Sequence, residues 1–324
     1  MNNPFFYEPD ALCLMAAEKV KGLVAQHETW REEVVQGKMF GVLVVERPTH
    51  HGTELGYLAA FSGQLGGKAT WEGFVPPVFD YLQPDGYFKI HEREISEINA
   101  QLSEMERNPL LNELKTRIAN EQETAETELK AYRKMMVEAK KERKDKRRRG
   151  ATAEEQAAMV AESQFQKAEL RRLKQRIKAQ IECLQAELNV QEKAMTDLKT
   201  KRKRLSDALQ RWLFQQFEML NARGERRNLL DIFAPTPQRT PPAGTGECCA
   251  PKLLQHAFVM GYRPLSMAEF WLGRSPKTEI RREGAFYPAC PGKCGPTLGF
   301  MLQGLDVACV PQKPIDRAAL RVVY

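Results

Sequence analysis

Four of the seven cysteines lie in two short clusters whose spacing suits metal binding. Cys248 and Cys249 are adjacent in Gly-Glu-Cys-Cys-Ala-Pro, and Cys290 and Cys294 follow about forty residues later in Tyr-Pro-Ala-Cys-Pro-Gly-Lys-Cys. Paired thiols beside glycine or proline turns are what a closed four-sulfur zinc site requires. The pattern therefore predicts a structural zinc ion bound by these four cysteines. The alternative is that they are buried thiols that pack as small hydrophobic side chains.

A basic block is the second chemical feature of the chain. The net charge is +7, and residues 140–149 alone contain eight basic and two acidic side chains. A concentrated basic block indicates a polyanionic partner, most often nucleic acid, although a solvated connector has the same composition. The predicted RNA-binding residues are its basic side chains: Lys140, Lys141, Arg143, Lys144, Lys146, Arg147, Arg148 and Arg149.

The chain shows no sequence pattern for export or membrane insertion. Its first residues lack a basic region followed by an apolar run, and no stretch approaches the ~18 apolar residues of a membrane span. We therefore expect a cytoplasmic protein without a membrane partner. Thiols stay reduced in that compartment, so clustered cysteines indicate metal binding rather than disulfides.

The middle of the chain, residues 92–227, must hold the basic block in place. Strong helix formers dominate it, and apolar residues recur at a 3-4 spacing from Leu170 to Leu188, with an interruption at Gln191 before the pattern resumes at Met195. This repeat is typical of a coiled coil.

Charge indicates how the coiled coil pairs. If the chain folds back at Gly150, the acidic residues 121–128 face the basic residues 171–178, and Glu92, Glu94 and Glu97 face residues 199–204. We therefore expect an antiparallel hairpin with the basic block at its tip, opposite only Glu154 and Glu155.

The two ends of the chain, residues 1–91 and 228–318, have mixed composition. We expect strands at 39–45 and 55–62 joined by a turn at 47–53, a helix at 252–260, a strand at 265–272 and a short helix at 297–305. Neither end alone supplies enough strands for a sheet with a buried face. The predicted fold class is therefore α+β, with one small mixed domain interrupted by the hairpin. The alternative is two small domains joined by a helical rod.

Three long segments carry a family resemblance. They are Gly-Thr-Gly-Glu-Cys-Cys-Ala-Pro-Lys-Leu-Leu at 244–254, Met-Ala-Glu-Phe-Trp at 267–271 and Tyr-Pro-Ala-Cys-Pro-Gly-Lys-Cys at 287–294. Together with Gly-Tyr-Leu-Ala-Ala-Phe-Ser-Gly at 56–63, they resemble the N-terminal region of large RluA-type RNA pseudouridine synthases. The resemblance covers essentially the whole chain, most loosely in the helical middle.

This resemblance implies a role in RNA modification. The family isomerises uridine in rRNA or tRNA without a cofactor, through an aspartate in an Arg-Leu-Asp motif followed by Thr-Ser-Gly. That motif is absent from the 324 residues, so we expect no catalytic residue here and no isomerase activity from this chain alone. Residues 319–324 look like the start of a synthase domain that is missing from this chain. We therefore expect a truncated or split gene product, with the synthase domain on a separate chain. The predicted function is that of an RNA-binding accessory region for structured RNA.

A second resemblance, to the zinc-dependent nucleoside deaminase fold, gives the competing hypothesis of a hydrolase. In that fold one zinc ligand opens a helix, a Pro-Cys-x-x-Cys opens the next, and a glutamate two residues after the first ligand moves protons. Cys249, Cys290 and Cys294 would be the ligands. Ala250 and Pro251 occupy the positions of the glutamate, and the second pair is one residue too long, so deamination is disfavoured. A coiled-coil adaptor without zinc or RNA is a third alternative.

Overall fold

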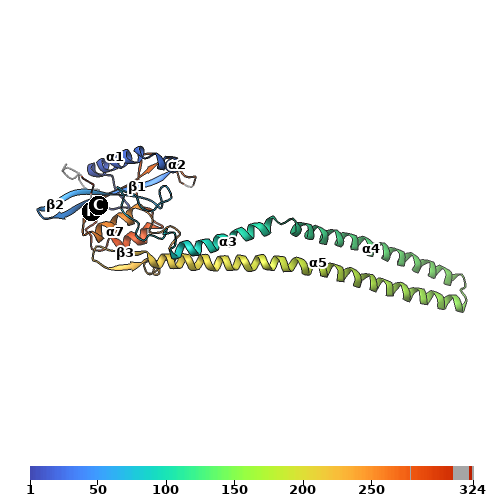
Figure 1. Ribbon diagram of the computed structural model, residues 1–324. Helices are drawn as coiled ribbons and strands as arrows, with labels where there is room; N and C mark the ends of the chain where they lie inside the picture. Colours follow the sequence, from blue (N-terminus) through green and yellow to red (C-terminus); the bar gives the residue numbers. More distant parts are fainter. Residues whose placement is uncertain (278, 309–320, 323–324) are drawn as a thin grey trace. The chain divides into compact units, whose positions relative to one another are not determined.

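The computed structural model describes residues 1–277, 279–308 and 321–322 (Figure 1). The chain forms two compact units. Residues 1–93 and 206–324 together form one unit, which combines helices with a sheet, and residues 94–205 form the other, which is helical. Both ends of the chain thus contribute to one core, and the second unit lies inside the segment 92–227.

A five-stranded sheet organises the first unit, in the order β6-β5-β1-β2-β7. The central strand pairs antiparallel with both long neighbours, and β7 pairs parallel with β2. The strands are β1 (Lys38–Thr49), β2 (Gly52–Phe61), β5 (Arg263–Leu272), β6 (Phe286–Tyr287) and β7 (Arg321–Val322). The three strands expected from sequence are confirmed. The turn lies within the expected range 47–53 but is shorter: β1 continues through Pro48, and only His50 and His51 lie between the paired residues Thr49 and Gly52.

Both faces of the sheet are buried. Phe40, Val42 and Val44 pack with helix α1 (Ala11–Gln26), whereas Leu43 and Val45 point into a second core. That second core contains α6 (Leu229–Phe233), α7 (Cys249–Val259) and α8 (Cys294–Met301). Figure 1 shows α1 and α7 on opposite sides of the sheet. Burial on both faces explains why residues 39–45 form a continuous apolar run rather than an alternating one.

Smaller elements complete this unit. A 3-10 turn (Glu28–Trp30) leads into α2 (Arg31–Gln36), and β3 (Glu218–Leu220) pairs with β4 (Arg226–Asn228). The helices expected at 252–260 and 297–305 are present, but each begins earlier, at a cysteine. The last expected segment, 319–324, is described only at Arg321 and Val322; its remaining residues lie outside the described part of the chain.

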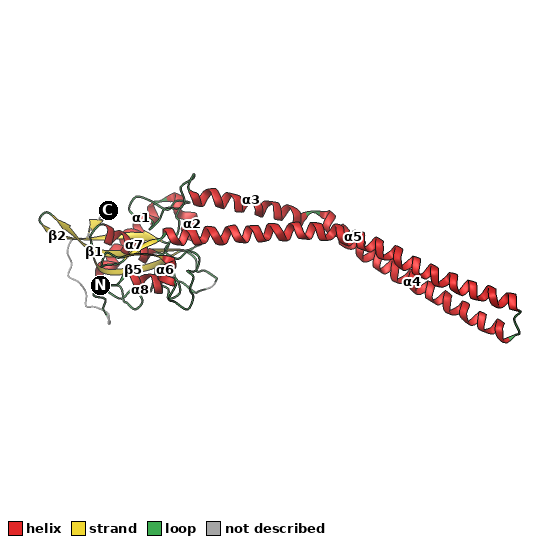
Figure 2. Cartoon of the chain, turned by 90° about the horizontal axis from the view of Figure 1, so that it is seen from below, coloured by secondary structure: helices red, strands yellow, loops and turns green. Residues whose placement is uncertain are grey.

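The second unit is an antiparallel helical hairpin (Figures 1 and 2). Helices α3 (Tyr87–Arg107) and α4 (Pro109–Arg148) form one arm, and α5 (Ala153–Gln216), which continues into the first unit, forms the other. The chain turns at Gly150, whose φ of 94° suits glycine. The expected pairing of acidic 121–128 with basic 171–178 is present, with Glu128 Oε1 2.7 Å from Arg176 Nη2, and Glu94 pairs with Lys201 at 3.1 Å. Glu92, however, pairs with Lys89 on its own helix.

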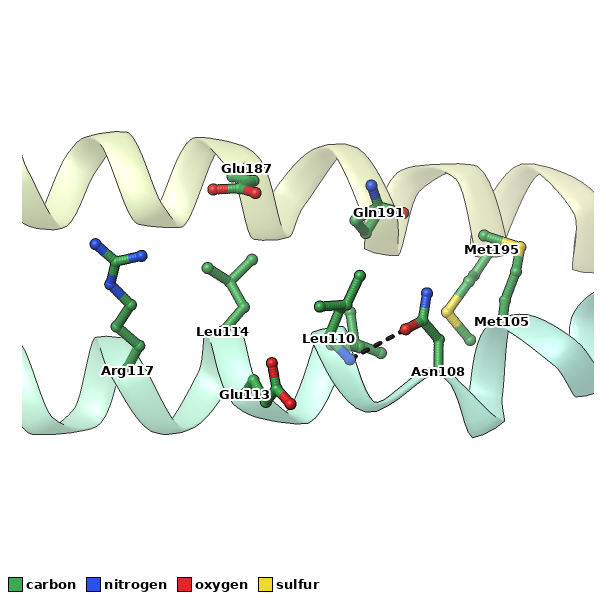
Figure 3. Close-up of a pocket in the computed structure, with 10 residues that line it drawn as sticks. Met105, Asn108, Leu110, Glu113, Leu114, Arg117, Glu187, Gln191 and Met195 are labelled. Atoms are coloured by element: carbon green, nitrogen blue, oxygen red, sulfur yellow. Dashed lines mark hydrogen bonds between the residues drawn. The ribbon is translucent and has the colours of Figure 1, made fainter.

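The first arm of the hairpin is interrupted at Asn108. This residue caps α4 by accepting a hydrogen bond from Leu110 N at 3.0 Å, and Pro109 opens the helix. A cavity of about 280 Å³ lies beside the break, and Figure 3 shows Leu110 and Met105 directed toward Gln191 and Met195 of α5. The gap in the apolar repeat at Gln191 therefore lies opposite the break in the first arm.

None of the helices in the described part of the chain is long and apolar enough to cross a membrane.

Candidate functional sites

The basic block ends α4 and faces solvent, with one exception. Arg143 is only 8% exposed, because its Nη1 lies 3.3 Å from Glu162 Oε2 and donates a hydrogen bond to Gln166 Oε1 at 3.1 Å. The expectation that the block faces only Glu154 and Glu155 is therefore wrong. Glu155 accepts a hydrogen bond from Thr152 N and so helps to cap the start of α5. Arg143 thus joins the two arms of the hairpin, and its side chain lines the groove described next.

The remaining cations divide between two surfaces. Lys140, Lys144 and Arg147 line a groove of about 740 Å³ between the two arms of the hairpin, together with Arg133 and Lys167. We call this the basic groove. Its floor includes the apolar side chains of Met136, Val137 and Leu170. Lys141, Lys146, Arg148 and Arg149 do not line the groove and are exposed elsewhere around the hairpin end.

The basic groove is strongly positive. None of its lining side chains is acidic, and within the described residues no carboxylate pairs with its five exposed cations. Lys140, Lys144 and Arg147 follow one another at intervals of four and three residues, so they lie on one face of α4, with about 5–6 Å between successive Cβ atoms. A row of free cations at this spacing suits a chain of phosphates.

Sequence reasoning missed two of these cations, Arg133 and Lys167. A signal for Arg133 was present, because Arg133, Lys140 and Arg147 are spaced seven residues apart and so share one face of a coiled-coil helix. Lys167 lies on the opposite arm, and only the register of the hairpin brings it to the groove.

The structure brings three of the four predicted zinc ligands together. Cys248 is the N-cap residue of α7, and Cys294 is the first residue of α8. The Sγ atoms of Cys290 and Cys294 are 3.6 Å apart, and the Cys248 thiol hydrogen-bonds with both. We call these three residues the thiol cluster. All described cysteines are free of disulfide bonds.

Cys249 does not join this cluster. Its side chain is fully buried and its Sγ contacts the carbonyl oxygen of Met39 on β1 at 3.4 Å. Adjacent residues at a helix start point about 100° apart, so Cys248 and Cys249 face different neighbours. The predicted four-thiol set is thus divided into a cluster of three and one thiol packed on the sheet.

The three thiols of the cluster differ in the direction in which their pKa values are shifted. Hydrogen bonds from Cys248 and then Cys294 lower the pKa of Cys290 well below its usual range. The hydrogen bond with Cys290 raises the pKa of Cys248, and the hydrogen bonds with Cys248 and Cys290 raise the pKa of Cys294. No set of three or more His, Cys, Asp or Glu side chains in the described ranges already has the arrangement of a metal site.

A buried carboxylic acid, Glu269 on β5, lies beside the thiol cluster. Its Oε1 accepts a hydrogen bond from Ala250 N at 3.1 Å, two residues beyond Cys248. Burial raises the pKa of Glu269 to about 7, and the hydrogen bond from Ala250 opposes that shift only in part. The deaminase pattern predicts a glutamate on the helix of Cys249. Glu269, which lies on the neighbouring strand β5, was therefore not identified from the sequence.

Because the pKa of Glu269 is raised in the folded protein, the free energy of unfolding depends on pH. In metal-free protein we expect the free energy of unfolding to fall by up to ~3 kcal/mol as the pH rises from about 4.5 to about 7. The unfolded chain releases this proton near pH 4.5, whereas the folded chain keeps it until about pH 7, so the folded state binds more protons in this window. Denaturant unfolding in EDTA at pH 5 and pH 7 measures the difference. Glu269→Gln should reduce it, and an undiminished difference in this variant would contradict the assignment.

The chain matches no family model, no curated protein and no solved structure.

Proposed function

We propose that this chain is an RNA-binding accessory region of an RluA-type pseudouridine synthase, and that the basic groove of the hairpin contacts the RNA. The observation that supports RNA binding is a set of five exposed cations in one groove at the hairpin end, none of which pairs with a carboxylate of the described residues. The partner is a structured RNA of the rRNA or tRNA class, and the compartment is the cytoplasm.

Contact with phosphates is the binding mode that this groove favours. Lys and Arg side chains line it, and no aromatic ring is among its lining residues, so bases have no stacking platform there. Phosphate contacts give affinity and orientation but no direct sequence information. Choice of the modified uridine would then belong to a synthase domain with the Arg-Leu-Asp motif, which the 324 residues lack.

The family assignment is supported by the motifs at 244–254 and 287–294. These segments contain the cysteines at which α7 and α8 begin, so the residues of the resemblance coincide with helix starts in the core of the first unit. The accessory role needs no cofactor for isomerisation and no catalytic residue from this chain.

For the first unit we propose a deaminase-like fold. Support comes from an antiparallel arrangement of β2, β1 and β5, with cysteines at the starts of the two helices, α7 and α8, that pack on one face.

A nucleoside hydrolase is the second candidate function, and the buried Glu269 beside the thiol cluster is the observation that favours it. Release of ammonia from a panel of nucleosides by purified protein separates this activity from RNA binding alone.

Salt dependence tests the RNA-binding proposal. We expect the full chain to bind structured rRNA and tRNA fragments, with a slope of log K against log salt of about −3.5 to −4.5 if five phosphates are neutralised. The affinity is measured by fluorescence anisotropy across a salt series. An acidic polymer without RNA structure, such as heparin, should compete at low salt. Absence of RNA binding at low salt, or binding that is insensitive to salt, would refute the proposal.

A further inference from the structure

One sulfur–sulfur distance in the thiol cluster can be compared directly with those of zinc sites and of disulfides. Zn–S bonds of ~2.3 Å at a tetrahedral angle place two ligand sulfurs ~3.8 Å apart, whereas a disulfide holds them at ~2.05 Å. The Sγ atoms of Cys290 and Cys294 are 3.6 Å apart, and Cys248 reaches both. The spacing is therefore close to that of zinc ligands and far from that of a covalent bridge.

The surroundings of the cluster suit thiolates. Cys248 caps the N-terminus of α7 without a side-chain hydrogen bond to its backbone, and Cys294 opens α8, so two helix N-termini direct their partial positive charge at the same sulfurs. Cys248 and Cys290 are partly exposed, so an ion can reach them and their side chains can turn onto it. Cys294 is buried and fixes the base of the site.

The fourth position is not supplied by the fourth predicted cysteine. Cys249 is fully buried and directed at Met39 on β1, away from the cluster. The carboxyl group that interacts with the three thiols is that of Glu269, fixed by the hydrogen bond from Ala250 N. Three protein ligands and one open position are the pattern of zinc sites that activate water, whereas purely structural sites are closed by four ligands.

We propose that the first unit binds one Zn²⁺ through the thiolates of Cys248, Cys290 and Cys294, with the fourth position open to water beside Glu269. This inference goes beyond RNA binding and does not depend on it. Binding releases the protons of those ligands that are still thiols, and the ion replaces the sulfur–sulfur hydrogen bonds of the cluster.

Metal content of the full chain tests this site. Protein purified without chelator and equilibrated with zinc chloride should contain about one zinc per chain by mass spectrometry and should unfold at a lower temperature after EDTA treatment. Cys248→Ser, Cys290→Ser and Cys294→Ser should each weaken zinc binding at least ~10-fold. Cys249→Ala and Cys183→Ser are the matched controls, one beside the cluster and one on the hairpin, and both should keep the ion.

A second measurement does not depend on variants that fold. Cobalt(II) exchanged into the wild-type chain should give thiolate charge-transfer absorption for three sulfurs rather than four. Glu269→Gln should retain the metal, because its carboxyl is not a ligand. A folded wild-type chain that takes up no zinc, a four-sulfur cobalt spectrum, or loss of the ion in Cys249→Ala or Glu269→Gln would overturn the assignment.

Discussion

Replacing Lys140, Lys144 and Arg147 with glutamate is expected to weaken binding of structured RNA roughly 100- to 1,000-fold at ~0.1 M salt. The three side chains line the basic groove from one face of α4, and no carboxylate among the described residues neutralises them. Each substitution removes a cation from the groove and adds a repulsive charge. The slope of log K against log salt should also become less steep by about 2 to 3.

The matched control is a second triple variant that makes the same change in net charge within residues 140–149. Lys141, Lys146 and Arg149 are exposed, lie outside the groove and, within the described ranges, have no carboxylate partner. Their replacement with glutamate should weaken binding less than ~10-fold, because only the screened long-range field changes. Equal losses in the two triple variants would show that total charge, and not the groove, governs binding.

Much of the hairpin could be predicted from sequence because its two patterns are strong. The apolar repeat defines two helical arms, and charge complementarity selects their antiparallel pairing around Gly150. The exact partners could not be predicted so well. Arg143 pairs with Glu162 rather than with residues at its own level, because helical side chains lean toward the N-terminus of their helix, which for Arg143 is away from the tip.

The thiol cluster shows a different limit of prediction from sequence, which is the direction in which each cysteine side chain points. Sequence grouped Cys248 with Cys249 because they are adjacent, but adjacent residues at a helix start diverge, and only one of the pair can face α8. Which one does so depends on where the helix begins. The sequence indicated a start near residue 252, whereas Cys248 is the N-cap. An error of a few residues in the predicted start of a helix is therefore enough to assign the wrong one of two adjacent thiols to a site.

Glu269 was missed for a related reason. It lies in the predicted strand 265–272, where an acidic residue inside an apolar segment was a visible signal. Alternation along β5 places Glu269 on the same face as Met267, which packs in the core with α7. The proximity of Glu269 to Cys248 requires the packing of α7 against β5, and that contact between distant segments is not encoded by local pattern.

Replacing Gly41 with alanine is expected to destabilise the first unit by roughly 3 kcal/mol and to lower its unfolding temperature by about 6–12 °C. Gly41 lies on β1, opposite the first residue of α7. A Cβ atom built there would be 2.6 Å from the Cβ of Cys249, closer than carbon atoms can approach. Because β1 is paired on both sides, with Ala60 and with Glu269, the strand cannot retreat and α7 must move.

The same substitution elsewhere provides the control. Gly22 lies in α1, and a Cβ atom there would meet nothing within 4 Å. Gly22→Ala should therefore be neutral or stabilise by up to ~1 kcal/mol, since alanine favours helix. Calorimetry or denaturant unfolding of the two variants measures the contrast. RNA binding below the unfolding temperature should be unchanged in both, because the basic groove lies wholly within the hairpin.

A double-mutant cycle identifies the contact responsible. Cys249→Gly removes the atom that the new Cβ would meet, so Gly41→Ala should cost less than ~1 kcal/mol in that background, a coupling of about 2 kcal/mol. Additive effects would mean that Gly41 is required for a reason other than the approach of α7. If the coupling is present, Gly41 sets the distance between α7 and the sheet, and thereby the position from which Cys248 reaches Cys290 and Cys294.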